Sequence, residues 1–146
     1  MLTSADAEAH HYDVSEVTDC TDLTEKNLLY LNKIIDLCEK QGVELMLVKT
    51  PSNATGEEKK YYNAVEATAK AHGVEFVDYN LCYDEIGLDL TQDFYDKTHL
   101  NIFGAEKFTK YFAENTSYFQ GKVRADRDWE EDLKKYEETK ANTKLF

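Results

Sequence analysis

The residues best suited to chemistry lie in one short stretch, Asp93 to Asn101, in which Asp96 precedes His99 by three positions. In a turn just ahead of a helix, an aspartate at this spacing can accept the Nδ1 proton of the imidazole. That bond leaves Nε2 free to act as a general base. The same spacing also suits a structural turn in which both residues hydrogen-bond to the backbone. Spacing alone favours the structural interpretation, so the surrounding elements have to be considered.

A regular α/β pattern precedes this stretch. A helix is predicted to begin after Thr24, its N-cap, and to end at Gly42, a left-handed C-cap. Its apolar positions recur at helical spacing and are Leu28, Leu31, Ile35 and Cys38. The next run, residues 43–48, is nearly continuous in apolar side chains, as a buried parallel strand is.

The same cycle then repeats. Thr55 and Glu58 predict a capping box for a second helix, which ends before Gly73. Residues 74–79 predict a second strand. The matching Gly-Val-Glu junctions at Gly42 and Gly73 indicate two successive βα units of one parallel sheet.

The remaining segments are less regular. Residues 12–17 alternate weakly and predict a short edge strand. A loop is expected from residue 80 to residue 100, followed by a helix that Asn101 caps and that ends near Gly121. The tail from Asp126 predicts an amphipathic helix that packs on the body of the protein, with partner binding as the alternative. Its apolar stripe is Trp129, Leu133 and Tyr136.

Three segments follow from these patterns: an N-terminal segment over residues 1–23, an α/β part over residues 24–121, and a charged helical tail over residues 122–146. The predicted fold class is α/β, with a three-layer flavodoxin-like parallel sheet and a C-terminal amphipathic helix. The sheet is expected to be incomplete because only two strands are clear. So small a parallel sheet leaves an open edge, which predicts a homo-oligomer.

Two loops are placed for ligand binding, because ligands of open α/β sheets sit beyond the carboxyl ends of the strands. These loops are residues 50–55 and residues 80–100. Ser52 and Asn53 in the first loop, and Asn101 directly after the second, are the predicted substrate contacts. We interpret Ser52 as a turn residue rather than a nucleophile, because no Gly-flanked elbow surrounds it.

The sequence Asp96-Lys97-Thr98-His99-Leu100-Asn101, followed by Gly104-Ala105, resembles the last conserved block of SGNH/GDSL hydrolases. In many bacterial members that block has the form DxxHLNxxGA. Residues 45–51 resemble the penultimate strand and its Pro-containing loop, and residues 76–79 resemble the last strand. Across residues 25–120 the chain is most similar to the branch that includes proteins of lipoteichoic-acid D-alanylation and alginate-type O-acetylation.

The resemblance implies that His99 is the base, and Asp96 its orienter, in an ester hydrolase or acyltransferase. Its substrate would be an acylated cell-surface glycan or polyol. The family's GDS block, which holds the nucleophile, and its GxND block, which supplies oxyanion donors, do not occur here. We therefore expect a C-terminal portion of such an enzyme that is inactive alone. A non-catalytic α/β module that binds a partner or self-associates is the alternative.

Composition and charge exclude several classes of binding partner and cofactor. With 29 acidic and 17 basic residues the net charge is -12, which repels phosphate backbones, so no nucleic acid is expected. No apolar run approaches the roughly 20 residues of a membrane span, and no signal peptide is evident, so the location stays open. Three cysteines without CxxC spacing predict neither a disulfide framework nor a zinc site. Asp93, Asp96 and His99 lack a further ligand, so no metal or other cofactor is expected.

Overall fold

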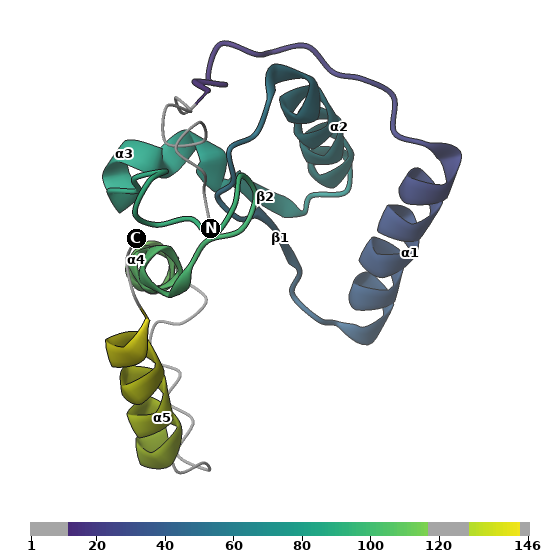
Figure 1. The fold of residues 1–146 in the computed structure, drawn as a ribbon. Helices are drawn as coiled ribbons and strands as arrows, with labels where there is room; N and C mark the ends of the chain where they lie inside the picture. The colour runs from purple at the N-terminus through teal and green to yellow at the C-terminus, as the bar shows by residue number, and fades with distance from the viewer. Residues whose placement is uncertain (1–11, 117–128, 144–146) are drawn as a thin grey trace. The chain divides into compact units, whose positions relative to one another are not determined.

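The chain forms two compact units in the computed structural model, which describes residues 12–116 and 129–143. One unit is His11–Tyr83, and the other comprises the described residues from Asp84 onward. The boundary falls inside the range 24–121 that the sequence groups together. Figure 1 labels the helices and strands, and each unit is described by itself.

The unit His11–Tyr83 is built on a small parallel sheet. Helix α1 (Glu25–Gln41) precedes strand β1 (Met46–Lys49), and helix α2 (Gly56–Ala71) connects β1 to strand β2 (Glu75–Asp78). The two strands lie side by side in parallel, with Leu47 opposite Phe76 (Figure 1). The predicted mixed α/β class with a parallel sheet is thus confirmed. Buried residues of this unit include Val14, Ile35, Ala69 and Tyr79.

Capping interactions between neighbouring residues determine where the two long helices of this unit begin and where α1 ends. The Thr24 side chain accepts a hydrogen bond from the backbone N–H of Asn27, and Gly42 ends α1 at φ 63°, where a glycine avoids the strain of a side chain. Thr55 and Glu58 form the complete capping box of α2. The predicted ends are thus confirmed. They could be predicted because each cap depends only on neighbouring residues.

The strands are shorter than predicted, and the helices explain why. The backbone N–H of Val43 donates to the carbonyl of Cys38 at 2.8 Å, and that of Val74 donates to the carbonyl of Ala69 at 2.9 Å. Both valines therefore still close the last turn of the preceding helix. The strands therefore begin at residues that follow these valines in the sequence.

The expected edge strand over residues 12–17 is wrong. The Asp13 side chain accepts a hydrogen bond from the backbone N–H of Ser15 at 2.9 Å, and Val17 N–H donates to the carbonyl of Val14 at 3.2 Å. An aspartate that bonds its own backbone two residues on makes a turn. The turn buries Val14 as an anchor of the segment.

The second unit is helical. The short helix η1 (Tyr79–Cys82) still belongs to the unit His11–Tyr83, and the short helix α3 (Tyr83–Ile86) spans the boundary between the units. Helix α4 (Ile102–Asn115) begins at the predicted Asn101 cap, but it does not reach Gly121, because Thr116 is extended at φ -116° and ψ 138°.

The predicted C-terminal helix is present as α5 (Trp129–Asn142). Lys140 of α5 forms an ion pair with Glu106 of α4 and lies 5.9 Å from the centre of the Phe103 ring. These contacts hold the last turns of α5 on α4. None of the described helices has the length and apolar character needed to cross a membrane.

Candidate functional site

Asp96 and His99 lie in a tight loop that the backbone closes. Phe94 and Leu100 form an isolated antiparallel bridge, and Tyr95 N–H donates to the carbonyl of His99 at 2.8 Å. Inside the loop, Oδ1 of Asp96 accepts the backbone N–H groups of Thr98 and His99, each at 2.8 Å. Asp96 therefore has the structural role that its spacing favours, as the residue that holds the turn.

The same carboxylate also contacts the imidazole. Nδ1 of His99 lies 2.8 Å from Oδ2 of Asp96, so the expected hydrogen bond is present. An ionised carboxylate can only accept, so Nδ1 carries the hydrogen in this bond and Nε2 becomes the acceptor of the neutral ring. The His99 side chain is 74% exposed, and Nε2 has no partner among residues 12–116 and 129–143. The imidazole can thus take a proton from an incoming group.

Hydrogen bonds stabilise the charged form of this carboxyl group. The backbone N–H of Thr98 and the side chain of His99 hold the pKa of Asp96 well below its ordinary range. The hydroxyl of Thr98 adds a further bond to Oδ1 at 3.0 Å. Asp96 therefore stays a carboxylate at physiological pH.

This shift gives a pH prediction. A carboxyl group whose pKa is lowered by folding stabilises the folded turn above its unfolded pKa of about 3.9, and loses that effect only as the pH falls through the lower folded value. We expect the Asp96 carboxyl carbon signal in NMR to stay constant from pH 7 to about pH 4, together with the Thr98 and His99 amide signals. Titration of Asp96 with a midpoint near 3.9 would contradict the hydrogen-bonded geometry.

Asn101 is fully engaged with the backbone. Its Oδ1 accepts from the N–H groups of Phe103 at 2.9 Å and Gly104 at 3.1 Å, which caps α4. Its Nδ2 donates to the carbonyl of Gln92 at 2.6 Å. Asn101 therefore joins the loop to the helix. Its predicted contact with a substrate stays a prediction.

The glycine of the same motif allows a close approach. A Cβ atom at Gly104 would lie 2.2 Å from the carbonyl oxygen of Asp93, nearer than atoms can come. Asp93 is buried, and its Oδ2 accepts from Asp89 N–H and from Lys107 Nζ, each at 2.7 Å. Asp93 is thus the anchor that fixes the loop on α4, a role that sequence reasoning missed.

Ser52 and Asn53, the other predicted substrate contacts, belong to the unit His11–Tyr83 and are buried just beyond the carboxyl end of β1. Ser52 N–H donates to Oδ1 of Asn80 at 2.8 Å, and Lys49 Nζ donates to Ser52 Oγ at 2.8 Å. Burial lowers the pKa of Lys49, while Asp78 and Glu58 oppose that shift. The hydroxyl of Ser52 is part of a polar network, and its contact with a substrate stays a prediction.

The network continues to a buried ion pair. Asn80 N–H donates to Oδ1 of Asp78 at 3.1 Å, and Lys59 Nζ donates to Oδ2 of Asp78 at 2.9 Å. The Lys59 and Asp78 side chains are 5% and 2% exposed. Sequence reasoning missed both residues, although a signal existed. Lys59 lies three positions before Tyr62 on the apolar side of α2, and Asp78 interrupts an apolar strand; charges so placed need a partner.

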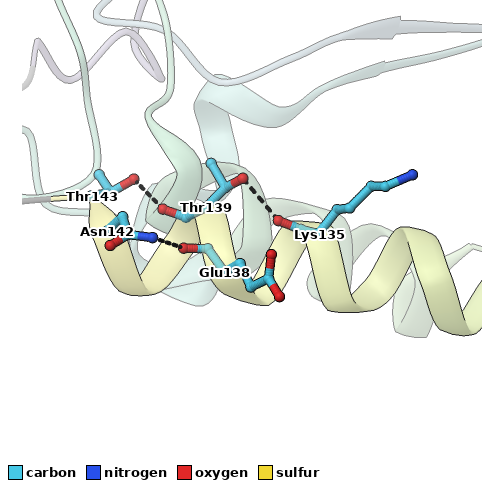
Figure 2. Close-up of a pocket in the computed structure, with 5 residues that line it drawn as sticks. All are labelled: Lys135, Glu138, Thr139, Asn142 and Thr143. Atoms are coloured by element: carbon cyan, nitrogen blue, oxygen red, sulfur yellow. Dashed lines mark hydrogen bonds between the residues drawn. The ribbon is translucent and has the colours of Figure 1, made fainter.

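We also searched the described residues for a metal site, for disulfides and for a pocket lined by unused polar groups. None of the described residues forms a group of three or more His, Cys, Asp or Glu side chains that could hold a metal ion. Cys20, Cys38 and Cys82 form no disulfide with one another. Figure 2 shows a shallow hollow on α5 in which the Thr139, Asn142 and Thr143 side chains donate to carbonyls four residues earlier in the same helix. The donors in this hollow are thus used by the helix itself.

These features define a mixed α/β protein with an exposed carboxylate–imidazole pair in a closed loop. The chain belongs to an uncharacterised protein family, whose model matches residues 9–119. No curated protein and no solved structure matches the chain. The matched range contains both Asp96 and His99 and ends before α5.

Proposed function

We propose that the chain is the C-terminal, acid–base portion of an SGNH-type ester hydrolase or O-acyltransferase that acts on a cell-surface glycan or polyol. The observation that carries the proposal is the 2.8 Å bond between Asp96 Oδ2 and His99 Nδ1, which leaves Nε2 exposed. In this function the carboxylate orients the ring and stabilises the imidazolium, and Nε2 accepts the proton of a nucleophilic hydroxyl.

The fold supports the same proposal. The parallel arrangement of β1, α2 and β2 is the repeating unit of flavodoxin-like sheets, and we propose that it is part of such a three-layer sheet. The DxxHLNxxGA pattern has a physical basis in this chain. Asn101 caps α4, Gly104 allows the helix to contact Asp93, and the two together hold the loop that carries Asp96 and His99.

The nucleophile is proposed to come from outside the printed sequence, which contains no GDS block. The chain alone should then hydrolyse p-nitrophenyl acetate no faster than buffer does, because a base without a nucleophile and an oxyanion site gives no acyl-enzyme. Turnover by the chain that is lost in both Ser52→Ala and His99→Ala would instead make Ser52 the nucleophile.

The decisive measurement uses the protein encoded by the complete natural reading frame, after its upstream sequence has been read for a GDS block. If that block is present, we expect His99→Ala to lower kcat for an acetylated polyol by about 10²–10⁴-fold, the usual effect of losing a general base. Lys97→Ala, in the same loop, is the matched control and should retain activity. Equal activity of the His99 and Lys97 variants, or a reading frame without the block, would refute the proposal.

A further inference from the structure

Helix α1 presents a second apolar stripe to solvent. Tyr30, Ile34 and Leu37 recur at i, i+4 and i+7, and their side chains are 54%, 49% and 58% exposed. The side of the helix that faces the unit is different and is centred on the buried Ile35. Large apolar side chains that gather on one exposed helix face mark an interaction surface more often than scattered ones do.

A row of lysines runs along one flank of this stripe. Lys26, Lys33 and Lys40 are seven residues apart, so they lie nearly in line, with a drift of about 20° per step. All three are exposed, and none forms an ion pair within the part of the chain that the structure describes. By contrast, the lysines at 59, 60, 107, 135 and 140 each pair with a carboxylate.

The acidic residues of α1 do not neutralise this row from the side of the stripe. With about 100° per residue, Glu25, Asp36 and Glu39 fall on the far side of the lysines from the apolar residues. Around the helix, the acidic residues are followed by the lysines, then by the exposed apolar stripe and then by the buried side. The exposed Leu29 is the apolar exception, because it lies between the acidic residues and the lysines. A partner that covers the apolar stripe meets the lysine row and not the carboxylates.

We infer that this face of α1, formed by Tyr30, Ile34, Leu37 and the three lysines, is a docking surface for an acidic amphipathic helix of a partner protein. At about 1.5 Å per residue the lysine row is about 21 Å long and the apolar stripe beside it about 10 Å long, and another helix can follow both. Acidic side chains along the partner's flank complement the lysines, and a leucine-rich seam complements the stripe.

Two other occupants fit less well. A membrane surface is planar, so it would bring the rest of the chain, with its net charge of -12, close to anionic lipid. A helix about 10 Å wide meets only this face. A second copy of the chain shares the negative charge, and antiparallel pairing through the same face would place lysine row against lysine row.

The test uses a synthetic helical peptide with a leucine seam and glutamate flanks, and its counterpart in which lysines replace the glutamates. In NMR titrations of the chain, the glutamate peptide should shift the amide signals of α1, and the lysine peptide should bind at least tenfold more weakly. The combined substitutions Lys26→Glu, Lys33→Glu and Lys40→Glu should lower the affinity for the glutamate peptide at least tenfold. Added salt should lower the affinity of the wild-type chain for the same peptide.

A pair of single variants controls for the fold and for general stickiness. Leu37→Ser on α1 and Leu133→Ser on α5 remove side chains that are 58% and 56% exposed, and only the first should weaken binding. Equal binding of both peptides, or no binding at millimolar concentration, would overturn the inference. Binding of phosphatidylglycerol vesicles without binding of the peptide would also overturn it. The same holds for a dimer that is seen in sedimentation and is dissociated by Leu37→Ser.

Discussion

Lys59→Met should destabilise the protein by about 3–5 kcal/mol, because it leaves the carboxylate of Asp78 buried without its cation. The pair is almost fully withdrawn from water, and the methionine keeps the length of the side chain but not its charge. Urea unfolding followed by circular dichroism measures the loss.

The adjacent Lys60 offers a matched control for this variant. Lys60 pairs with Glu57 at 2.8 Å, but Glu57 is well exposed, so Lys60→Met should destabilise the protein far less than Lys59→Met does. Both changes replace lysine by methionine in the same turn of α2. A similar loss in the two variants would mean that helix propensity or expression, and not burial of the ion pair, determines the effect.

A double variant separates the orphaned charge from lost packing. Asp78→Asn removes the charge, and the remaining amide oxygen can still accept the N–H of Asn80. When Lys59→Met and Asp78→Asn are combined, we expect part of the stability lost in Lys59→Met to return. If the double variant is less stable than the wild type by the full sum of the two single losses, the two residues act independently and the network does not couple them.

Most of what the sequence predicts correctly depends on neighbouring residues. The caps at Thr24, Thr55 and Asn101 and the bond between Asp96 and His99 each join residues two or three positions apart. Such pairs meet whenever the local backbone adopts the expected turn. Helix ends and the geometry of the Asp96 loop could therefore be predicted without knowledge of the packing.

The features that sequence reasoning missed join distant positions. Ser52 and Asn80 are 28 residues apart, and Lys59 and Asp78 are 19 apart. Their meeting depends on how β1 and β2 pair, and a parallel register is set by packing rather than by a local signal. The strand starts are mispredicted for a related reason. A valine after a helix suits either the first position of a strand or the closing bond of the helix, and at positions 43 and 74 it makes the closing bond.

Gly104→Ala should be the most damaging small substitution in the Asp96 loop. The new methyl group would lie 2.2 Å from the carbonyl oxygen and 2.9 Å from Cβ of Asp93, so either the backbone or the first turn of α4 has to move. Asp93 cannot move freely, because its carbonyl accepts Asn101 N–H at 2.8 Å and its carboxylate binds Lys107. Overpacking of a tight site costs about 1–3 kcal/mol of stability. We expect a loss at the upper end of this range, because the clash is with backbone atoms, which cannot rotate away as a side chain can.

The same displacement should reach the acid–base pair, because the loop from Asp93 to Asn101 holds both Asp96 and His99. We expect the Nδ1–H form of the neutral His99 ring, as seen by ¹⁵N NMR, to lose its dominance in Gly104→Ala. Gly56→Ala is the control, because its methyl group would meet only a side-chain carbon of Val17 at an ordinary 3.6 Å and alanine favours the helix by up to about 1 kcal/mol. If Gly104→Ala unfolds at the same urea concentration as wild type and keeps the Nδ1–H ring, then α4 does not rest on Asp93, and the motif glycine needs another explanation.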